Sequence, residues 1–421
     1  MKIAAIVLTG GKVRPNTKRK TFDSFGFLGL QMVINEMAIK GHEIEYCTIS
    51  TVEQYDLALL SITAPEDITT FLKGIKAGNY KKGKCFVAAG GAGCINICSI
   101  YDFIDMAVFG RAEGLADKII SKQQSKNIWV KKEDPMLETS YAIRQVKNLH
   151  ADENGCCGCR NKCYFCQYTW TRKLVGKNYS AGGEGYTVNE EDFVSLCLDK
   201  PGRYTTGIDG LSYETRKRVN KGFVTDKLIR DKFENAIGKG HGKAIMLKLF
   251  GIVGYPWETI QTAREDAMNF GELFNGINEK YSSGRLMAAM HLTPFSPEPL
   301  TPMEHVPANI RTNWRRCFGG RSYPLINNDR INVFIGPYTT TEPTLARRVM
   351  INRCKLSERS KVFKIVTSSL EGVTGHEIYR KVTEYLNRDV FGWHQPGEII
   401  PFLKTYNDYT KIGRKLFPNG C

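Results

Sequence analysis

The sequence contains no run of about 18 apolar residues, the length that a membrane-spanning helix requires. Its opening segment, MKIAAIVLTGGK, has six consecutive apolar residues and then glycines, which is not the pattern of a secretory signal. Its 13 cysteines among 421 residues are far fewer than a disulfide scaffold has. We therefore expect a cytoplasmic protein without a membrane partner, in which clustered cysteines indicate metal binding or catalysis.

The chain also lacks a run of Lys or Arg long enough to form a basic tail, and it has no internal repeat or low-complexity tract. Nevertheless the chain has 59 basic and 43 acidic residues, which gives a net charge of +16 that is spread along the chain. This excess favours a nucleic-acid partner, although a small-molecule or peptide partner stays open. At roughly 100–200 residues per domain, the length predicts two or three domains.

Apolar segments of strand and helix type alternate over residues 1–130. KIAAIVLTG, DLALLSIT and KCFVAAGG have the continuous hydrophobicity of buried parallel strands, and helical patterns separate them. This rhythm predicts an α/β fold with a doubly wound parallel sheet, which binds ligands at the carboxyl ends of its strands. The candidate residues at those ends are Thr9, Gly10, Ser61, Gly90, Gly91 and Gly110. Residues 121–150 are predicted to be a polar connection.

Five cysteines lie within GCCGCRNKCYFC, where Cys159, Cys163 and Cys166 have the spacing C-x3-C-x2-C. Three closely spaced thiolates on one loop can ligate three irons of a 4Fe-4S cluster and leave one iron open. A zinc site normally adds a second ligand pair, and no second CxxC pair or HxxxH is present. Zinc and a purely structural cluster stay as alternatives. Cys156 and Cys157 are predicted to be bystanders, because adjacent thiols do not easily bind one cluster.

The segment CRNKCYFC resembles the radical S-adenosylmethionine superfamily, in which an aromatic residue, here Phe165, precedes the last cysteine. The resemblance implies that the open iron is chelated by S-adenosylmethionine. One electron from the cluster would then cleave that cofactor and give a 5′-deoxyadenosyl radical. It also implies an electron donor such as flavodoxin or ferredoxin. The protein would supply ligation, orientation and exclusion of water.

Three later segments resemble the barrel of the subclass of these enzymes that carries a cobalamin-binding domain. They are TTGIDGLSYETRKRVNKGF, KLFGIVGYPWET and HLTPFSPEPLTP. The first implies that Asp209 lies at a strand end facing the cofactor; otherwise it is a helix cap or a surface acid. In YSAGGEGYT, Gly182, Gly183 and Glu184 resemble the motif that binds the methionine amino group. They follow Cys166 closely, so a simple flexible turn is the alternative.

The N-terminal segments resemble the cobalamin-binding domain itself, but the loop DxHxxG, whose histidine ligates cobalt, is absent. Binding without a protein histidine and loss of the cofactor both stay open. The expected architecture is therefore a cobalamin-binding-like domain over 1–130, a partial (β/α) barrel over 150–310 and a small α+β C-terminal region over 311–421. Either Met290 or His291, on a predicted barrel strand, is expected to face the substrate.

These features predict a radical S-adenosylmethionine enzyme, with cobalamin-dependent methylation of an unactivated carbon as the favoured reaction. One alternative is a radical modification or rearrangement of a nucleic-acid base without cobalamin. Another is a cluster-containing nucleic-acid-binding module without turnover. The sequence does not name the substrate.

Overall fold

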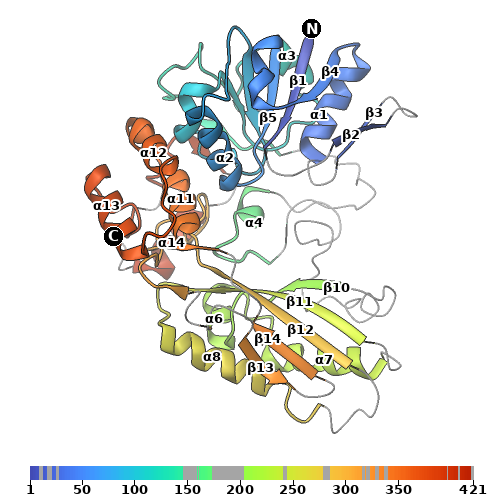
Figure 1. Ribbon diagram of the computed structural model, residues 1–421, viewed down its shortest axis with the longest axis vertical. Helices are drawn as coiled ribbons and strands as arrows, with labels where there is room; N and C mark the ends of the chain where they lie inside the picture. The colour runs from blue at the N-terminus through green and yellow to red at the C-terminus, as the bar shows by residue number, and fades with distance from the viewer. Residues whose placement is uncertain are drawn as a thin grey trace.

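The computed structural model describes residues 1–8, 13–16, 21–24, 28–145, 159, 161–172, 203–239, 244–277, 285–314, 318, 323–327, 331–335, 340–395, 397–405 and 408–418. Two sheets organise the molecule, with the cysteine segment between them (Figure 1). Among the described residues, no helix is both long and apolar enough to span a membrane.

The first sheet has the strand order β4-β1-β5-β6-β7-β8. Its strands are β1 (Lys2–Val7), β4 (Glu43–Cys47), β5 (Leu57–Ser61), β6 (Phe86–Gly90), β7 (Met106–Val108) and β8 (Ile128–Val130). All neighbours are parallel except β7 and β8. The short hairpin of β2 (Val13–Asn16) and β3 (Thr21–Ser24) stands apart from it. The predicted parallel α/β character is confirmed, whereas the edge strand β8 lies in a stretch predicted to be a connection.

Different helices cover the two faces of this sheet. Helices α1 (Leu28–Ile39) and α3 (Ala116–Ile120) pack on one face. Helix α2 (Pro65–Lys76) packs on the other, with the 3₁₀ turns η1 (Ile49–Gln54) and η2 (Cys98–Phe103). Alternate residues of β1 divide between the two cores: Ile3 and Ala5 face α1, whereas Ala4 and Ile6 face α2. A strand buried on both sides must be apolar throughout, which explains the sequence KIAAIV.

Helices from the end of the chain complete the second of these cores. They are α11 (Glu342–Asn352), α12 (Arg359–Val366) and α13 (Gly375–Leu386), with the turn η3 (Leu356–Glu358) and helix α14 (Tyr409–Leu416) nearby. Val349, Val362 and Ile378 belong to the same apolar cluster as the strand residues Leu60 and Ala89. In addition, β15 (Leu403–Lys404) pairs in parallel with β9 (Tyr141–Ala142). The C-terminal helices therefore cover the N-terminal sheet.

The second sheet has the strand order β10-β11-β12-β14-β13, and only β13 is antiparallel to its neighbour. Its strands are β10 (Arg203–Gly207), β11 (Ala244–Val253), β12 (Arg285–Pro294), β13 (Tyr323–Asn327) and β14 (Ile331–Ile335). Helices α6 (Tyr213–Arg218), α7 (Asp226–Lys239) and α8 (Ile260–Glu272) lie along it (Figure 1). Strand pairing thus extends this sheet to Ile335, beyond the boundary at residue 310 that the sequence predicts.

Candidate functional site

The cysteine loop, residues 159 and 161–166 of the described chain, is attached to the end of helix α6. The backbone amide of Tyr164 donates to the carbonyl of Val219 at 3.0 Å. The side-chain amide of Asn220 donates to the carbonyls of Asn161 and Lys162 at 3.3 and 3.0 Å. Lys162 and Asn220 both have positive φ, 45° and 60°, so each chain bends sharply at this contact. The loop is thereby held against the segment that follows β10.

Helix α4 (Gln167–Thr171) holds the loop from its other side, because Cys166 is the residue that caps this helix. The Thr169 hydroxyl donates to the carbonyl of Cys159 at 2.9 Å, and the indole of Trp170 donates to the carbonyl of Cys163 at 2.8 Å. The ring centroid of Phe165 lies 6.4 Å from that of Tyr255. The conformation of the loop is therefore held by these hydrogen bonds and by the ring packing of Phe165.

The thiols of Cys159, Cys163 and Cys166 lie close enough to influence one another electrostatically. Burial raises the pKa of Cys163, whose side chain is 6% exposed, and the nearby Lys221 opposes this rise. Burial also raises the pKa of Cys166 to about 11, against hydrogen bonds from the backbone of Thr169 and Tyr168. A positive charge and N–H donors stabilise thiolates, the form in which cysteine binds metal. The donor set thus fits an iron–sulfur cluster.

Within the described ranges, no three His, Cys, Asp or Glu side chains converge closely enough to hold a single metal ion. A 4Fe-4S cluster does not require such convergence, because each thiolate binds a different iron. Cys156 and Cys157 lie outside the described residues.

Asp209 lies just beyond the carboxyl end of β10, beside the cysteines. It adopts φ = 54°, and its backbone amide donates to the carbonyl of Phe250 at 3.1 Å. Its carboxylate pairs with Lys221, whose side-chain nitrogen also donates to the carbonyl of Gly207 at 2.6 Å. Helix α6 is capped by Ser212, so Asp209 is not a helix cap. The sequence analysis did not single out Lys221, because its role as the buried partner of an acid appears only in three dimensions.

Lys221 is a buried cation surrounded by acidic groups, with 4% of its surface exposed. Burial lowers the pKa of its ammonium, but the Asp209 carboxylate and the thiols of Cys163 and Cys166 more than offset this effect. The pKa of Lys221 therefore lies above its usual value, and the side chain stays charged beside the thiols. A fixed positive charge at this place would stabilise thiolates or an anionic ligand group.

The sheet face that continues from this point, called the open face below, carries exposed side chains among the described residues. Phe250 pairs with His291 across β11 and β12, their ring centroids are 6.0 Å apart, and Phe250 is 38% exposed. The Lys248 ammonium lies 4.9 Å from the Phe250 ring centroid. Met290, by contrast, is fully buried in the core under the helices. Of the two residues proposed from the sequence, His291 is thus the one on the open face.

The turn after β11 contains a buried carboxyl group, Glu258, immediately before the capping residue Thr259 of α8. Its oxygens accept hydrogen bonds from the amides of Gly254 and Tyr255, at 2.7 and 3.2 Å. Burial, the dominant effect, raises the pKa of this carboxyl from its usual 4.5 to about 7, and the hydrogen bonds oppose the rise. Glu258 therefore stabilises the turn that contains Tyr255, whose ring contacts Phe165.

We expect the pH dependence of stability to change in the variant Glu258→Gln. Because the folded pKa is raised, the favourable contribution is fully present below pH 4.5 and is lost as the pH rises through about 7. Urea unfolding at about pH 5 and pH 8 should show a drop in stability for the native protein that is smaller for Glu258→Gln. The variant Glu265→Gln, on the exposed side of α8, should retain the native drop. An unchanged drop in Glu258→Gln would contradict the assignment.

The carboxyl edge of the first sheet brings together Ser61 and Gly90, which pair in register across β5 and β6. Gly91 has φ = 120°, and a β-carbon at this position would lie 2.2 Å from the Ile62 carbonyl oxygen, so only glycine fits. Gly110 likewise packs on the backbone of Arg144, with which it forms a β-bridge. Thr9 and Gly10, and Gly182, Gly183 and Glu184 of the predicted methionine-binding motif, lie outside the described residues.

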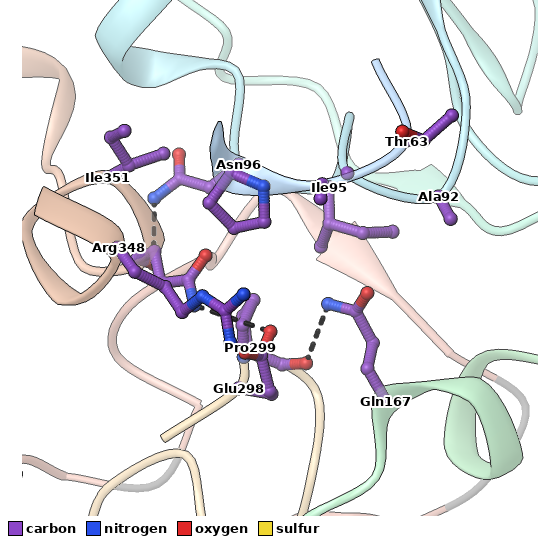
Figure 2. Close-up of a pocket in the computed structure, with 13 residues that line it drawn as sticks. Thr63, Ala92, Ile95, Asn96, Gln167, Glu298, Pro299, Arg348 and Ile351 are labelled. Carbon is purple, nitrogen blue, oxygen red and sulfur yellow. Dashed lines mark hydrogen bonds and ion pairs between the residues drawn. The ribbon is translucent and has the colours of Figure 1, made fainter. Parts of the chain in front are cut away.

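A cavity of about 190 Å³ lies where this edge meets helices α4 and α11 (Figure 2). Gln167, the residue after Cys166, donates to the carbonyl of Pro299 at 3.2 Å. Arg348 pairs with Glu66 at 2.6 Å and approaches Glu298 at 4.0 Å. The cavity is smaller than the roughly 300–1,000 Å³ of typical ligand pockets. It nevertheless offers carboxylate, amide and carbonyl groups between the first sheet and the cysteine loop.

No family model matches the chain, and no curated protein matches it. Two solved structures of the cobalamin-dependent S-adenosylmethionine radical enzyme OxsB do. The structure with aqua-cobalamin bound has a TM-score of 0.42 and 12% identity, over 64% of this chain and 52% of that chain. The structure with aqua-cobalamin and S-adenosylmethionine bound has a TM-score of 0.41 and 9% identity, over 99% and 84%. These neighbours are radical S-adenosylmethionine enzymes. The similarity is distant and assigns no role to any residue here.

Proposed function

We propose that this protein is a radical S-adenosylmethionine enzyme that acts on an unactivated C–H group. The observation that carries the proposal is the loop of Cys159, Cys163 and Cys166. Its three thiols lie close together, beside a buried Lys221–Asp209 pair at the carboxyl end of a parallel strand. The chemistry that the bound cluster supplies is one-electron cleavage of S-adenosylmethionine. The chain's own side chains would bind and orient S-adenosylmethionine and the substrate and exclude water.

In this proposal the three cysteines hold the cluster, and Lys221 with Asp209 provides a charged pair for a polar part of S-adenosylmethionine. Phe165 excludes water from the loop by packing on Tyr255. The open sheet face of Phe250, His291 and Lys248 is then the surface that receives the substrate. Aromatic, imidazole and ammonium groups suit a planar or anionic substrate, because they supply stacking and positive charge.

For the reaction outcome we propose methyl transfer with cobalamin as the methyl carrier, at the carboxyl edge of the first sheet. Two features support this. The strand order places Ser61 and Gly90 at that edge, and the cavity beside them is lined by groups that hydrogen-bond to amides, which cobalamin carries in number. The cavity admits only part of so large a cofactor. Without cobalamin, the same site would perform a radical modification or rearrangement.

The decisive experiment is anaerobic reconstitution of the full chain with iron, sulfide and cobalamin, followed by absorption spectra and assay of 5′-deoxyadenosine. We expect a cluster spectrum, release of 5′-deoxyadenosine from S-adenosylmethionine, and retention of cobalamin through gel filtration. If the protein takes up no iron, the proposal is wrong. If the protein forms the cluster and releases 5′-deoxyadenosine but retains no cobalamin, the methyl-transfer proposal is wrong, and the proposal of a radical S-adenosylmethionine enzyme still holds.

A further inference from the structure

Exposed basic side chains lie in the cysteine loop and in helices α6 and α14. Lys217 and Arg218 form the last turn of α6, directly before the segment that hydrogen-bonds to the loop. Arg414 and Lys415 lie in the last turn of α14. We call the five exposed residues Lys162, Lys217, Arg218, Arg414 and Lys415 the basic rim.

A stack of rings connects the two halves of the basic rim. The Arg218 guanidinium lies 5.5 Å from the Trp257 ring centroid. Trp257 in turn stacks on Phe417 with 6.3 Å between centroids and 6° between planes, and Phe417 follows Lys415 by two residues. Trp257 also stacks on Tyr255, at 5.1 Å, which contacts Phe165 of the cysteine loop. The rim is therefore one surface, and only a few rings separate it from the cysteines.

Apolar surface adjoins the basic rim, since Leu416, which follows Lys415 in α14, is 36% exposed. In the described helices α6 and α14 and their caps, the acidic groups are Glu214, at the start of α6, and Asp408, which caps α14 and accepts a hydrogen bond from the Lys411 amide. A small apolar area within a ring of like charge is typical of short-lived complexes between charged proteins. In such complexes electrostatic attraction sets the rate of encounter.

We propose that the basic rim is the docking surface for an acidic one-electron carrier protein that reduces the iron–sulfur cluster. This inference rests on the proposed function, because it assumes a cluster at Cys159, Cys163 and Cys166. The reduced carrier loses one electron, the cluster gains it, and no bond is made or broken in the transfer. Lys217 and Arg218 lie directly before Asn220, which hydrogen-bonds to the cysteine loop, so a partner on the rim lies close to the cluster ligands. This proximity favours an electron carrier over a nucleic acid, because only the carrier needs access to the cluster.

The test compares two charge reversals of equal size. The variant Lys217→Glu/Arg218→Glu changes the basic rim, and Lys364→Glu/Lys381→Glu changes exposed residues of α12 and α13, which pack on the first sheet. Calorimetric titration with oxidised flavodoxin, an acidic flavoprotein, measures docking without any need for turnover. We expect roughly tenfold weaker binding for the rim variant and native binding for its control, with the native affinity falling as salt is added.

A kinetic readout uses the reconstituted holoenzyme with three reductants. With reduced flavodoxin at low concentration, the rim variant should release 5′-deoxyadenosine roughly tenfold more slowly than the native protein. With dithionite or reduced methyl viologen, small reductants of opposite charge, the two proteins should agree. Equal binding and equal flavodoxin-driven rates in all three proteins would overturn the proposal. So would an equal loss in both variants, or a selective loss of RNA binding with flavodoxin unaffected. If dithionite drives no reaction in any protein, the proposed function fails, and the titration still tests the docking surface.

Discussion

Replacement of Cys159, Cys163 and Cys166 by alanine is expected to abolish both the iron–sulfur absorbance and the release of 5′-deoxyadenosine. Each thiolate would bind a different iron, so the loss of one ligand leaves an iron exposed, and the loss of all three removes the attachment altogether. Cys163 should be the most sensitive single position, because it is the most buried and lies closest to the charged pair. Iron content, absorption spectra and product assay together measure the effect.

Two matched controls show that the expected effect belongs to ligation. Cys98→Ala removes a buried thiol from the first sheet's core, outside the C-x3-C-x2-C motif, and should keep full iron content. Cys156→Ala/Cys157→Ala tests the two predicted bystanders in the same way. If the triple alanine variant kept the cluster spectrum, ligation by this loop would be refuted. A loss of iron in Cys156→Ala/Cys157→Ala would instead give those residues a place among the ligands.

Removal of the buried ammonium group in Lys221→Met is the second change with a large expected effect. It leaves the Asp209 carboxylate without its partner and the carbonyl of Gly207 without its hydrogen-bond donor. Breaking a buried ion pair from one side costs about 3–5 kcal/mol. We expect a loss of this size in the urea-unfolding free energy, together with weaker cluster retention, because a positive charge no longer stabilises the thiolates.

The double variant Lys221→Met/Asp209→Asn separates a charge effect from a packing effect. With the carboxylate neutralised, most of the lost stability should return, whereas cluster retention should stay low. Lys217→Met, on the exposed side of α6, should match the native protein in both measurements. A Lys221→Met protein with native stability and native iron content would show that the pair contributes nothing to the site.

Local pattern was enough to predict the first sheet. The strands β1, β5 and β6 are apolar apart from the end residues Lys2 and Ser61, because helices cover both faces, and such runs stand out in a sequence. The edge strand β8 was missed because its three apolar residues lie between the polar stretches SKQQSKN and KKEDPM, which are typical of a connection. The extension of the second sheet to β14 was also missed, since a pairing between Leu286 and Ile331 depends on a contact distant in the sequence.

Some residues of the candidate site could be predicted from neighbouring residues in the sequence, and others only from contacts between segments that are distant in the sequence. The spacing of Cys159, Cys163 and Cys166 is a local signal, so the sequence alone was sufficient to propose it. Lys221 became a candidate only when folding brought it onto Asp209, and Gln167 only when the cavity appeared beside it. The choice of His291 over Met290 required knowing which face of β12 the helices cover. The assignment of residues 311–421 as a separate region overlooked the packing of α11 on α2.

The packing of α11, α12 and α13 on the first sheet has a consequence for how the chain is assembled. The two ends of the polypeptide form one unit, and the second sheet, with the cysteine loop before it, is inserted between them. A ribosome that has released residues 1–145 has produced a sheet whose second face is covered only by α2 and the turns η1 and η2, because the other residues of that core come from later in the chain. That unit can close only after the inserted part has been synthesised. If the proposed function is correct, the cysteine loop therefore has the opportunity to acquire its cluster before the C-terminal helices pack on the first sheet.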